Sequence, residues 1–144
     1  MSFLLDTNVV SEWAKPRPDP GVVAWLAEAD EDRVFISAAT IAGIRYAIER
    51  LALGKRRNQL NRWLIDDLPV RFEDRILPVD AQVGDRWGRA MARRQATGRP
   101  VSIMDAIIAA TAERHDMDLI TRNVTDFASL GVRVVNPWRD GAVG

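Results

Sequence analysis

The chain has 144 residues, of which 47% are hydrophobic and 28% are charged. These values fit one globular domain with a buried core and exclude a wholly disordered chain. Twenty basic and twenty acidic residues balance to zero net charge, which excludes a globally basic nucleic-acid binder but allows a local basic face. Because the chain has no cysteine and a single histidine, His115, disulfides, thiolate zinc sites, cysteine nucleophiles and multi-histidine metal sites are also excluded.

The apolar segments predict a cytoplasmic protein with no membrane span. Residues 1–6 lack the basic and long apolar regions of a signal peptide. The longest apolar stretch, residues 106–112, is far shorter than a membrane-spanning helix requires.

Short apolar runs alternate with helical repeats along the chain, which is typical of β–α units. Strands are predicted at residues 3–5, 34–37, 76–79, 119–121 and 132–135. A helix or turn is predicted after residues 6–8, and helices are predicted near residues 21–29, 41–51, 60–64, 83–91 and 102–117. The predicted fold class is therefore α/β: one domain over residues 1–144, with a largely parallel central sheet of four to five short strands and helices on both faces.

Prolines, glycines and capping residues predict where the helices begin and end. The three prolines between residues 16 and 20 predict a stiff, extended connector. Gly54 is predicted to follow the helix of residues 41–51 as its C′ residue, and Pro69 to stop the next helix. Asp80 is predicted to cap the helix that follows.

Carboxylates and amides gather where strands are predicted to end. Asp6 follows the first strand, and Asn123 and Asp126 follow the fourth. Asp105 lies in the first turn of a strongly apolar helix, where an unpaired acid is costly to bury. Sites in open α/β sheets form at the carboxyl ends of strands, and Mg²⁺ prefers oxygen ligands of this kind. The residues thus permit hydrolysis of a phosphodiester by metal-activated water.

Each of these acids also has an ordinary structural interpretation. Asp6 fits an N-cap, and Ser102 with Asp105 fits a capping box with a shortened acid. Asp126 fits a residue that starts a turn, and His115 fits a favourable charge near a helix C-terminus. Spacing alone leaves these alternatives open.

Five segments together resemble the PIN-domain ribonucleases. Residues 4–12 (LLDTNVVSE) resemble the family's opening strand and turn, and residues 36–48 (ISAATIAGIRYAI) its second strand and following helix. Residues 105–112 (DAIIAATA) and 119–127 (LITRNVTDF) resemble its later motifs. Residues 135–138 (VNPW) are similar to the FitB-like branch of the VapC-type toxins. The order and spacing agree over nearly the whole chain.

The resemblance implies the toxin of a type II toxin–antitoxin pair, a Mg²⁺- or Mn²⁺-dependent endoribonuclease. It implies a VapB-type antitoxin as inhibitor, a homodimer, toxin–antitoxin hetero-oligomers, and contact with operator DNA only through the antitoxin. Asp6 and Asp105 match the family's metal-binding aspartates, and Asn123 falls where relatives place an acid or an asparagine. Asp126 is expected to act as an outer-shell acid. Thr7 and Asn8 are expected to orient Asp6 by hydrogen bonds.

One position departs from the family pattern. The family has a glutamate in a Thr-x-x-Glu stretch, whereas this chain has Thr40 followed by Gly43. Glycine inside a helix costs about 1 kcal/mol relative to alanine, so Gly43 is not explained by helix stability. The hypothesis is that Gly43 leaves the site one carboxylate short and weakens metal binding and catalysis.

Arg86, Arg89 and Arg93 recur at spacings of three and four in one predicted helix and are candidates for contact with RNA or the antitoxin. An ordinary solvated helix face is the alternative. 

Two other functions fit parts of the sequence. One is a catalytically silent PIN fold that binds its antitoxin and takes part in operon regulation, which Gly43 favours. The other is a receiver-like or phosphatase-like domain that uses Asp6. Asn8 stands where such a phosphatase needs a second aspartate, and neither Lys15 nor Lys55 lies late enough for a receiver.

Overall fold

The computed structural model describes residues 1–140, so the predicted domain end at residue 144 lies outside the described part. Its five strands form one sheet in the order β3-β2-β1-β4-β5, and every pairing is parallel. The strands are β1 (Phe3–Leu5), β2 (Val34–Ser37), β3 (Ile76–Leu77), β4 (Asp118–Ile120) and β5 (Val134–Val135). The predicted α/β class with a parallel sheet is confirmed.

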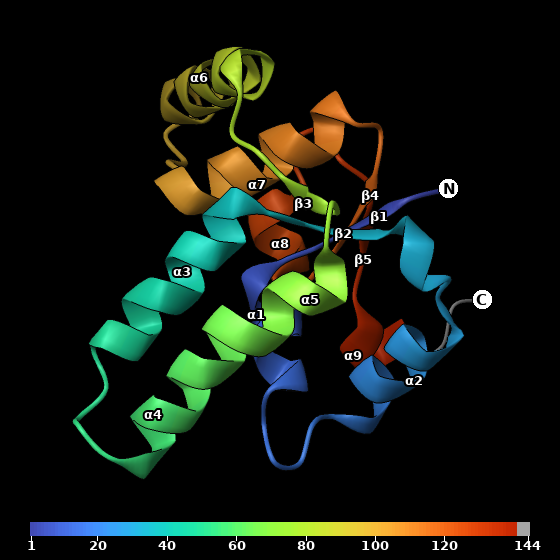
Figure 1. Cartoon of the computed structure of the whole chain (residues 1–144). Coiled ribbons are helices and arrows are strands. Elements are labelled where there is room, and N and C mark those ends of the chain that lie inside the picture. The colour runs from blue at the N-terminus through green and yellow to red at the C-terminus, as the bar shows by residue number, and fades with distance from the viewer. Residues whose placement is uncertain (141–144) are drawn as a thin grey trace.

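The helices connect these strands and cover both faces of the sheet (Figure 1). The first half of the chain contributes α1 (Thr7–Trp13), α2 (Pro20–Glu28), α3 (Ala38–Glu49), α4 (Lys55–Arg62) and α5 (Leu68–Phe72). The second half contributes α6 (Ala81–Ala96), α7 (Ile103–Arg114), α8 (Val124–Phe127) and α9 (Pro137–Asp140). A short 3-10 turn, Glu31–Arg33, precedes β2. No helix within residues 1–140 combines the length and apolar character that crossing a bilayer requires.

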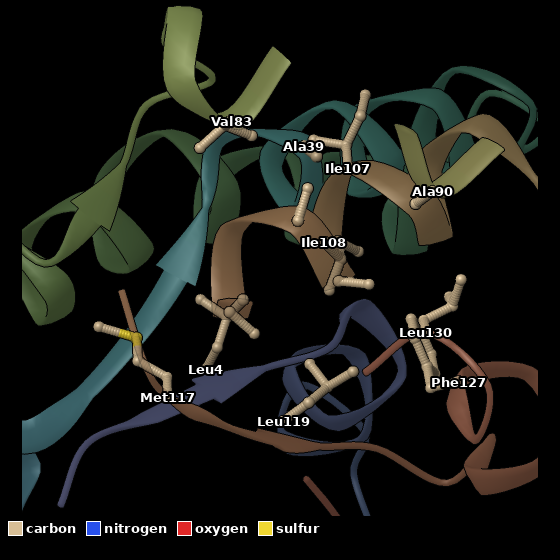
Figure 2. Close-up of a cluster of buried hydrophobic side chains, with 13 residues drawn as sticks. Leu4, Ala39, Val83, Ala90, Ile107, Ile108, Met117, Leu119, Phe127 and Leu130 are labelled. Atoms are coloured by element: carbon tan, nitrogen blue, oxygen red, sulfur yellow. The ribbon is translucent and has the colours of Figure 1, made fainter. Parts of the chain in front are cut away.

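Alternating side chains of β1 and β4 divide the core into two layers. Leu4 and Leu119 face α6 and α7, and Figure 2 shows them beneath Ile107 and Ile108 of α7. Leu5 and Ile120 face the opposite cluster, which contains buried residues of α1, α2, α3 and α5. Successive residues of a strand point to opposite faces, so fully buried strands need this continuous apolar sequence.

The order of the strands places one crevice at the centre of the sheet. The chain runs from β1 outward through β2 to β3, and then returns to the other side of β1 for β4 and β5. Ligand sites in open α/β sheets lie at the carboxyl ends of the strands where the order reverses. Here that point lies between the ends of β1 and β4, directly before Asp6 and Thr121.

Two predicted helix boundaries are wrong. Gly54 does not end α3, because that helix stops at Glu49 with Arg50 as its C-cap, and the Gly54 carbonyl instead begins α4 by accepting the Asn58 amide (3.1 Å). Pro69 does not stop its helix either. A π-helical turn over Trp63–Asp67 leads into α5, and Pro69 lies in the first turn of α5, where no amide hydrogen is needed.

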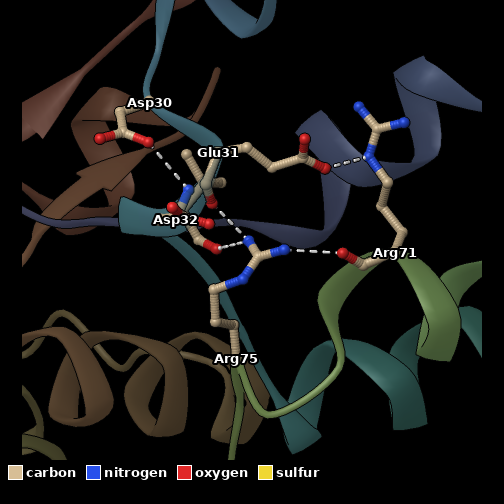
Figure 3. A network of polar contacts seen from close by, with 6 residues as sticks. Asp30, Glu31, Asp32, Arg71 and Arg75 are labelled. Carbon is tan, nitrogen blue, oxygen red and sulfur yellow. Dashed lines mark hydrogen bonds and ion pairs between the residues drawn. The ribbon is translucent and has the colours of Figure 1, made fainter.

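Arginines tie together the amino end of β2 and the end of α5 (Figure 3). Arg75 donates to the carbonyls of Val34 (2.6 Å) and Arg71 (2.7 Å), and the Arg71 guanidinium pairs with Glu31 (2.6 Å). These bonds pair backbone carbonyls and the Glu31 carboxylate at the amino ends of the strands, away from the crevice. The amino end of β2 is therefore joined to the end of α5 by one ion pair and by hydrogen bonds from Arg75.

Candidate active site

Asp6 lies at the carboxyl end of β1 and is only 3% exposed. Its Oδ1 accepts a hydrogen bond from the Thr7 amide (2.7 Å). Its Oδ2 accepts bonds from the Thr121 hydroxyl (2.7 Å) and from Asn8 Nδ2 (3.3 Å). Asp6 is also the N-cap of α1, so the capping interpretation and the site interpretation apply to the same carboxylate. Donors from two strand ends hold it in one orientation.

Thr121 belongs to this arrangement although the sequence pattern did not single it out as a site residue. It is fully buried, and its hydroxyl also accepts from Asn8 Nδ2 (3.3 Å) and from the Asn123 amide (3.0 Å). Asn8 in turn accepts the Arg122 amide (3.3 Å). In the sequence, Thr121 could have been noticed as a hydroxyl residue that follows an apolar strand. Its hydrogen bond to Asp6 requires β4 to lie beside β1, which no local sequence pattern shows.

Asp105 occupies the first turn of α7, one turn after Ser102. The Ser102 hydroxyl accepts the Asp105 amide (3.1 Å), so the hydroxyl half of the predicted capping box is present. The Asp105 carboxylate is half-buried, and burial raises its pKa above the ordinary value. The helix cap and the perturbed carboxylate therefore coexist at this position.

Asp6, Asp105 and Asp126 share one negative field. Burial is the main cause that raises the pKa of Asp6, and the charges of Asp105 and Asp126 raise it further against the opposing hydrogen bonds of Thr121 and Thr7. The charge of Asp126 also raises the pKa of Asp105. Such mutually repelling carboxylates are a physical mark of a functional site, because a cation placed among them removes the repulsion.

Asn123 and Asp126 belong to the short helix α8 and its N-cap, after β4. Asn123 is the N-cap of the short helix α8, and its carbonyl accepts the Asp126 amide (3.1 Å). Arg94 of α6 donates to the Asp126 carbonyl and to the Ser129 hydroxyl, both at 3.0 Å. Asp126 thus lies within a helix whose backbone α6 holds, and the interpretation as a turn-starting loop residue is incomplete.

Position 43 faces the site. A Cβ added to Gly43 would lie 3.5 Å from both Oγ1 and the methyl carbon of Thr7 and 3.6 Å from the Met104 methyl carbon, which are ordinary contacts. Thr7 directly follows Asp6, and Met104 directly precedes Asp105. A longer side chain at position 43 would therefore extend between the neighbours of the two aspartates.

The donor set suits a hard divalent cation but is sparse. Within residues 1–140, no group of three or more histidines, cysteines, aspartates and glutamates is arranged to hold a metal ion. Mg²⁺ nevertheless binds proteins through one or two carboxylates and completes its shell with water. A buried Asp6 without a basic partner and a half-buried Asp105 fit that requirement, so these two residues could hold the ion.

Two of the three predicted arginines pair with acids other than Asp6, Asp105 and Asp126. Arg86 pairs with Glu113 (2.9 Å), which is two turns of α7 beyond Asp105, and Arg89 pairs with Asp85 (3.1 Å). Arg93 is exposed near the end of α6. The structure brings Arg94, the next residue along, to the site through its bond to Asp126, but it pairs Arg86 and Arg89 elsewhere.

The comparisons with known proteins agree with this geometry. The family described as PIN domain matches residues 3–132. Toxin FitB of Neisseria gonorrhoeae is 37% identical over 138 residues, which cover 96% of this chain and 99% of FitB. VapC ribonuclease Y4jK of Sinorhizobium fredii is 33% identical and covers 94% and 97% of the two chains.

A solved structure of FitAB bound to an IR36 DNA fragment contains a similar fold. It superposes with a TM-score of 0.86 at 36% identity, covering 95% of this chain and 96% of that chain. Sequence and fold agree over nearly the full length of both proteins. The chain belongs to the PIN-domain family, within its group of VapC- and FitB-like toxins of toxin–antitoxin systems.

Proposed function

We propose that this chain is the toxin of a type II toxin–antitoxin pair and a metal-dependent endoribonuclease that hydrolyses RNA phosphodiester bonds. The observation that carries the proposal is the buried Asp6 carboxylate at the β1–β4 crevice, in the field of Asp105 and Asp126 and with no arginine or lysine paired to it within residues 1–140. A relative of 33% identity is named a VapC ribonuclease, which supports RNA as the substrate.

Asp6 and Asp105 would hold Mg²⁺ or Mn²⁺ in this mechanism. When bound, the ion offsets charge on the phosphoryl oxygens and lowers the pKa of the attacking water. Thr121 and Asn8 keep the Asp6 oxygens aimed at the crevice through their hydrogen bonds. Asn123 and Asp126 act from the outer shell, Asn123 by positioning the substrate and Asp126 by accepting a proton from water.

Gly43 leaves the site one carboxylate short, and the catalytic rate of this chain is lowered for that reason. The supporting geometry is the direction of a Cβ at position 43, which points between Thr7 and Met104 with room for a side chain. A glutamate there would add a third carboxylate to the pair of Asp6 and Asp105. The same observation favours the second candidate function, a silent PIN fold that binds antitoxin.

The test compares the chain, purified free of antitoxin, with Gly43→Glu and Gly43→Ala in RNA cleavage with Mg²⁺ or Mn²⁺. Gly43→Glu is expected to raise metal affinity and cleavage by at least about 10- to 100-fold, the size of effect that loss of a group supporting a metal ligand has. Gly43→Ala is the matched control, because it adds about 0.5–1 kcal/mol of helix stability without a carboxylate. Asp105→Asn should abolish cleavage in every background.

The outcomes separate the two functions. Cleavage by Gly43→Glu alone supports a ribonuclease whose chemistry Gly43 has weakened. Equal cleavage by all three chains retains the ribonuclease and shows that the missing-acid hypothesis is wrong. Absence of cleavage in all three, with RNA of every structural class and either metal, favours the silent antitoxin-binding fold.

Partners follow from the same proposal. We expect a homodimer that acts in the cytoplasm and is inhibited by a VapB-type antitoxin, which alone contacts operator DNA. The FitAB structure with its DNA fragment supports an assembly of this kind. Light scattering of the chain with and without its antitoxin, followed by a DNA-shift assay, checks each step.

A further inference from the structure

A polar cavity of about 490 Å³ opens beside the carboxylates. The loop after β4, helix α8 and the start of α9 form it, and its lining includes Arg122, Asn123, Thr125, Asp126 and Arg139. Two arginines outnumber the single aspartate among these residues. The charged residues of the cavity therefore carry a net positive charge, whereas Asp6 and Asp105 are negative. The proposed metal mechanism does not use the arginines of this cavity.

Arg122 has a defined place at the entrance to this cavity. Its amide donates to Asn8 Oδ1, which fixes its backbone against the same asparagine that contacts Asp6. Its guanidinium lies 5.4 Å above the Trp138 ring, within the range of a cation–π contact. The pKa of Glu12 is lowered mainly by its hydrogen bond from Lys15, and the charge of Arg122 contributes a smaller part.

The Glu12 carboxylate has other hydrogen-bond partners than Arg122. The Glu12 oxygens are occupied by Lys15 Nζ (2.8 Å) and by the Asp19 amide (2.9 Å). Among the side chains that the structure describes, neither Arg122 nor Arg139 forms an ion pair. Two guanidinium groups at one polar cavity therefore keep donors that face solvent.

The cavity adjoins the proposed reaction centre through Asn123 and Asp126. Asn123 and Asp126 line it, and the charge of Asp126 acts on both Asp6 and Asp105. An RNA strand whose scissile phosphate lies at Asp6 must continue across a neighbouring surface, and each step along the strand brings another phosphate. Guanidinium groups bind phosphate oxygens through two parallel, charge-assisted hydrogen bonds.

We infer that Arg122 and Arg139 form a subsite for the backbone phosphate next to the scissile bond of single-stranded RNA. This inference rests on the proposed ribonuclease function and adds how the substrate is positioned. Phosphate is favoured over the carboxylate of a protein partner because the strand already passes the adjoining acids. An antitoxin carboxylate in the same cavity is the competing outcome.

The experiment measures the binding of a labelled single-stranded RNA by fluorescence anisotropy at several salt concentrations in Ca²⁺. The chains are the unmodified protein, Arg122→Gln, Arg139→Gln, the double variant and Arg122→Lys. Arg33→Gln is the matched control. It removes the same charge, but Arg33 lies before β2, at the amino ends of the strands and away from the cavity. Thermal unfolding of each chain confirms that the fold is retained.

The double variant is expected to raise Kd about tenfold and to reduce the slope of log K against log salt by about 0.7, the value for one lost phosphate contact to single-stranded nucleic acid. Each single glutamine substitution should produce part of both effects. Arg122→Lys should restore the slope but only part of the affinity, and Arg33→Gln should change neither. An RNA with one neutral methylphosphonate next to the scissile position should bind the double variant and the unmodified chain with equal affinity.

Other results overturn the inference in distinguishable ways. If the arginine variants bind RNA as tightly as the unmodified chain while cleavage persists, the subsite is wrong and the ribonuclease remains. If they lose affinity for the antitoxin but not for RNA, the cavity is a protein-binding site. If no chain, Gly43→Glu included, binds or cleaves RNA, the proposed function itself fails.

Discussion

Two buried aspartates lie at opposite ends of neighbouring strands and are compensated in different ways. Asp118 begins β4 and is 7% exposed, and Nε of Arg133 lies 2.5 Å from its Oδ1. Asp6 follows β1 and is 3% exposed, but among residues 1–140 the hydrogen-bond donors that contact it are a hydroxyl and two amides. A buried carboxylate is stable when a cation pairs with it. Arg133 supplies that cation for Asp118, whereas under the proposed function a bound metal ion supplies it for Asp6.

The same contrast holds between the amino ends and the carboxyl ends of the strands. At the amino ends of the strands, Glu31 pairs with Arg71, and Asp30 pairs with Arg33. At the carboxyl ends, burial and the charges of Asp105 and Asp126 raise the pKa of Asp6, and burial and the charge of Asp126 raise the pKa of Asp105. The acids at the amino ends are thus paired with arginines, whereas under the proposed function the acids at the carboxyl ends bind a cation. Variants at the two ends of the strands should therefore respond differently to added metal.

The largest expected effect comes from removing the Thr121 hydroxyl. Thr121→Val leaves Asp6 without its 2.7 Å donor, removes the Thr121 acceptor of the Asn123 amide, and leaves Asn8 Nδ2 with Asp6 as its remaining acceptor. We expect a loss of about 1–3 kcal/mol in the free energy of unfolding, typical of buried groups left unpaired. Metal affinity should fall about 10- to 100-fold, as when the support of a metal ligand is removed.

Urea unfolding with and without Mg²⁺ measures both effects at once. Thr121→Ser keeps the hydroxyl and should restore most of the stability and the metal response. If Thr121→Val bound Mg²⁺ as tightly as the unmodified chain, then Asp6 would not depend on β4 for its orientation, and the crevice would not be the metal site.

A smaller effect is expected at the amino ends of the strands. Arg133→Gln leaves the buried Asp118 carboxylate without its cation, but Arg133 itself is well exposed, so we expect a loss of only about 1 kcal/mol. The Mg²⁺ response should be unchanged. Arg133→Lys serves as the control that keeps the charge. A fall in the Mg²⁺ response in Arg133→Gln would show that the two ends of the strands are coupled rather than independent.

Most of the fold was predictable because its signals are local. All five strands follow from short apolar runs, and the Asp80 side chain caps α6 by accepting the Val83 amide (2.9 Å), as predicted. The errors arose where one residue type serves two purposes. Glycine fits the end of one helix and the start of the next, and Gly54 lies between both. Proline fits a helix stop or a first turn, and Pro69 occupies a first turn.

The site was predictable only in part, for a different reason. Asp6 was expected at a strand end because one acid follows one apolar run. The partners of Asp6 depend on the order of strands in the sheet, which joins Thr121 to a residue 115 positions earlier in the chain. The same holds for Arg122 beside Trp138 and for Arg94 beside Asp126. Periodicity indicated the helix face of Arg86 and Arg89 but could not show that Glu113 and Asp85 pair with them.

The smallest effect concerns pH and has opposite signs with and without metal. Burial and the charge of Asp126 raise the pKa of Asp105 above its ordinary value of 3.8. A carboxyl whose pKa rises on folding binds its proton more tightly in the folded state, so the ionised form destabilises the fold. This destabilisation is absent below pH 3.8 and develops as the pH rises through the raised value.

Asp105→Asn should therefore be more stable than the unmodified chain at pH 7 in EDTA, by about 0.5 kcal/mol, because partial exposure screens the charge. Below pH 3.8 the two chains should unfold at the same urea concentration. Saturating Mg²⁺ should reverse the order at pH 7, since the ion stabilises only the chain that retains both carboxylates. Urea midpoints across this pH range, measured with EDTA and with Mg²⁺, check both signs. A different result would contradict the proposal. If Asp105→Asn were less stable than the unmodified chain in EDTA at pH 7, the Asp105 carboxylate would stabilise the fold without a metal ion, and Asp6 and Asp105 would not form a cation site.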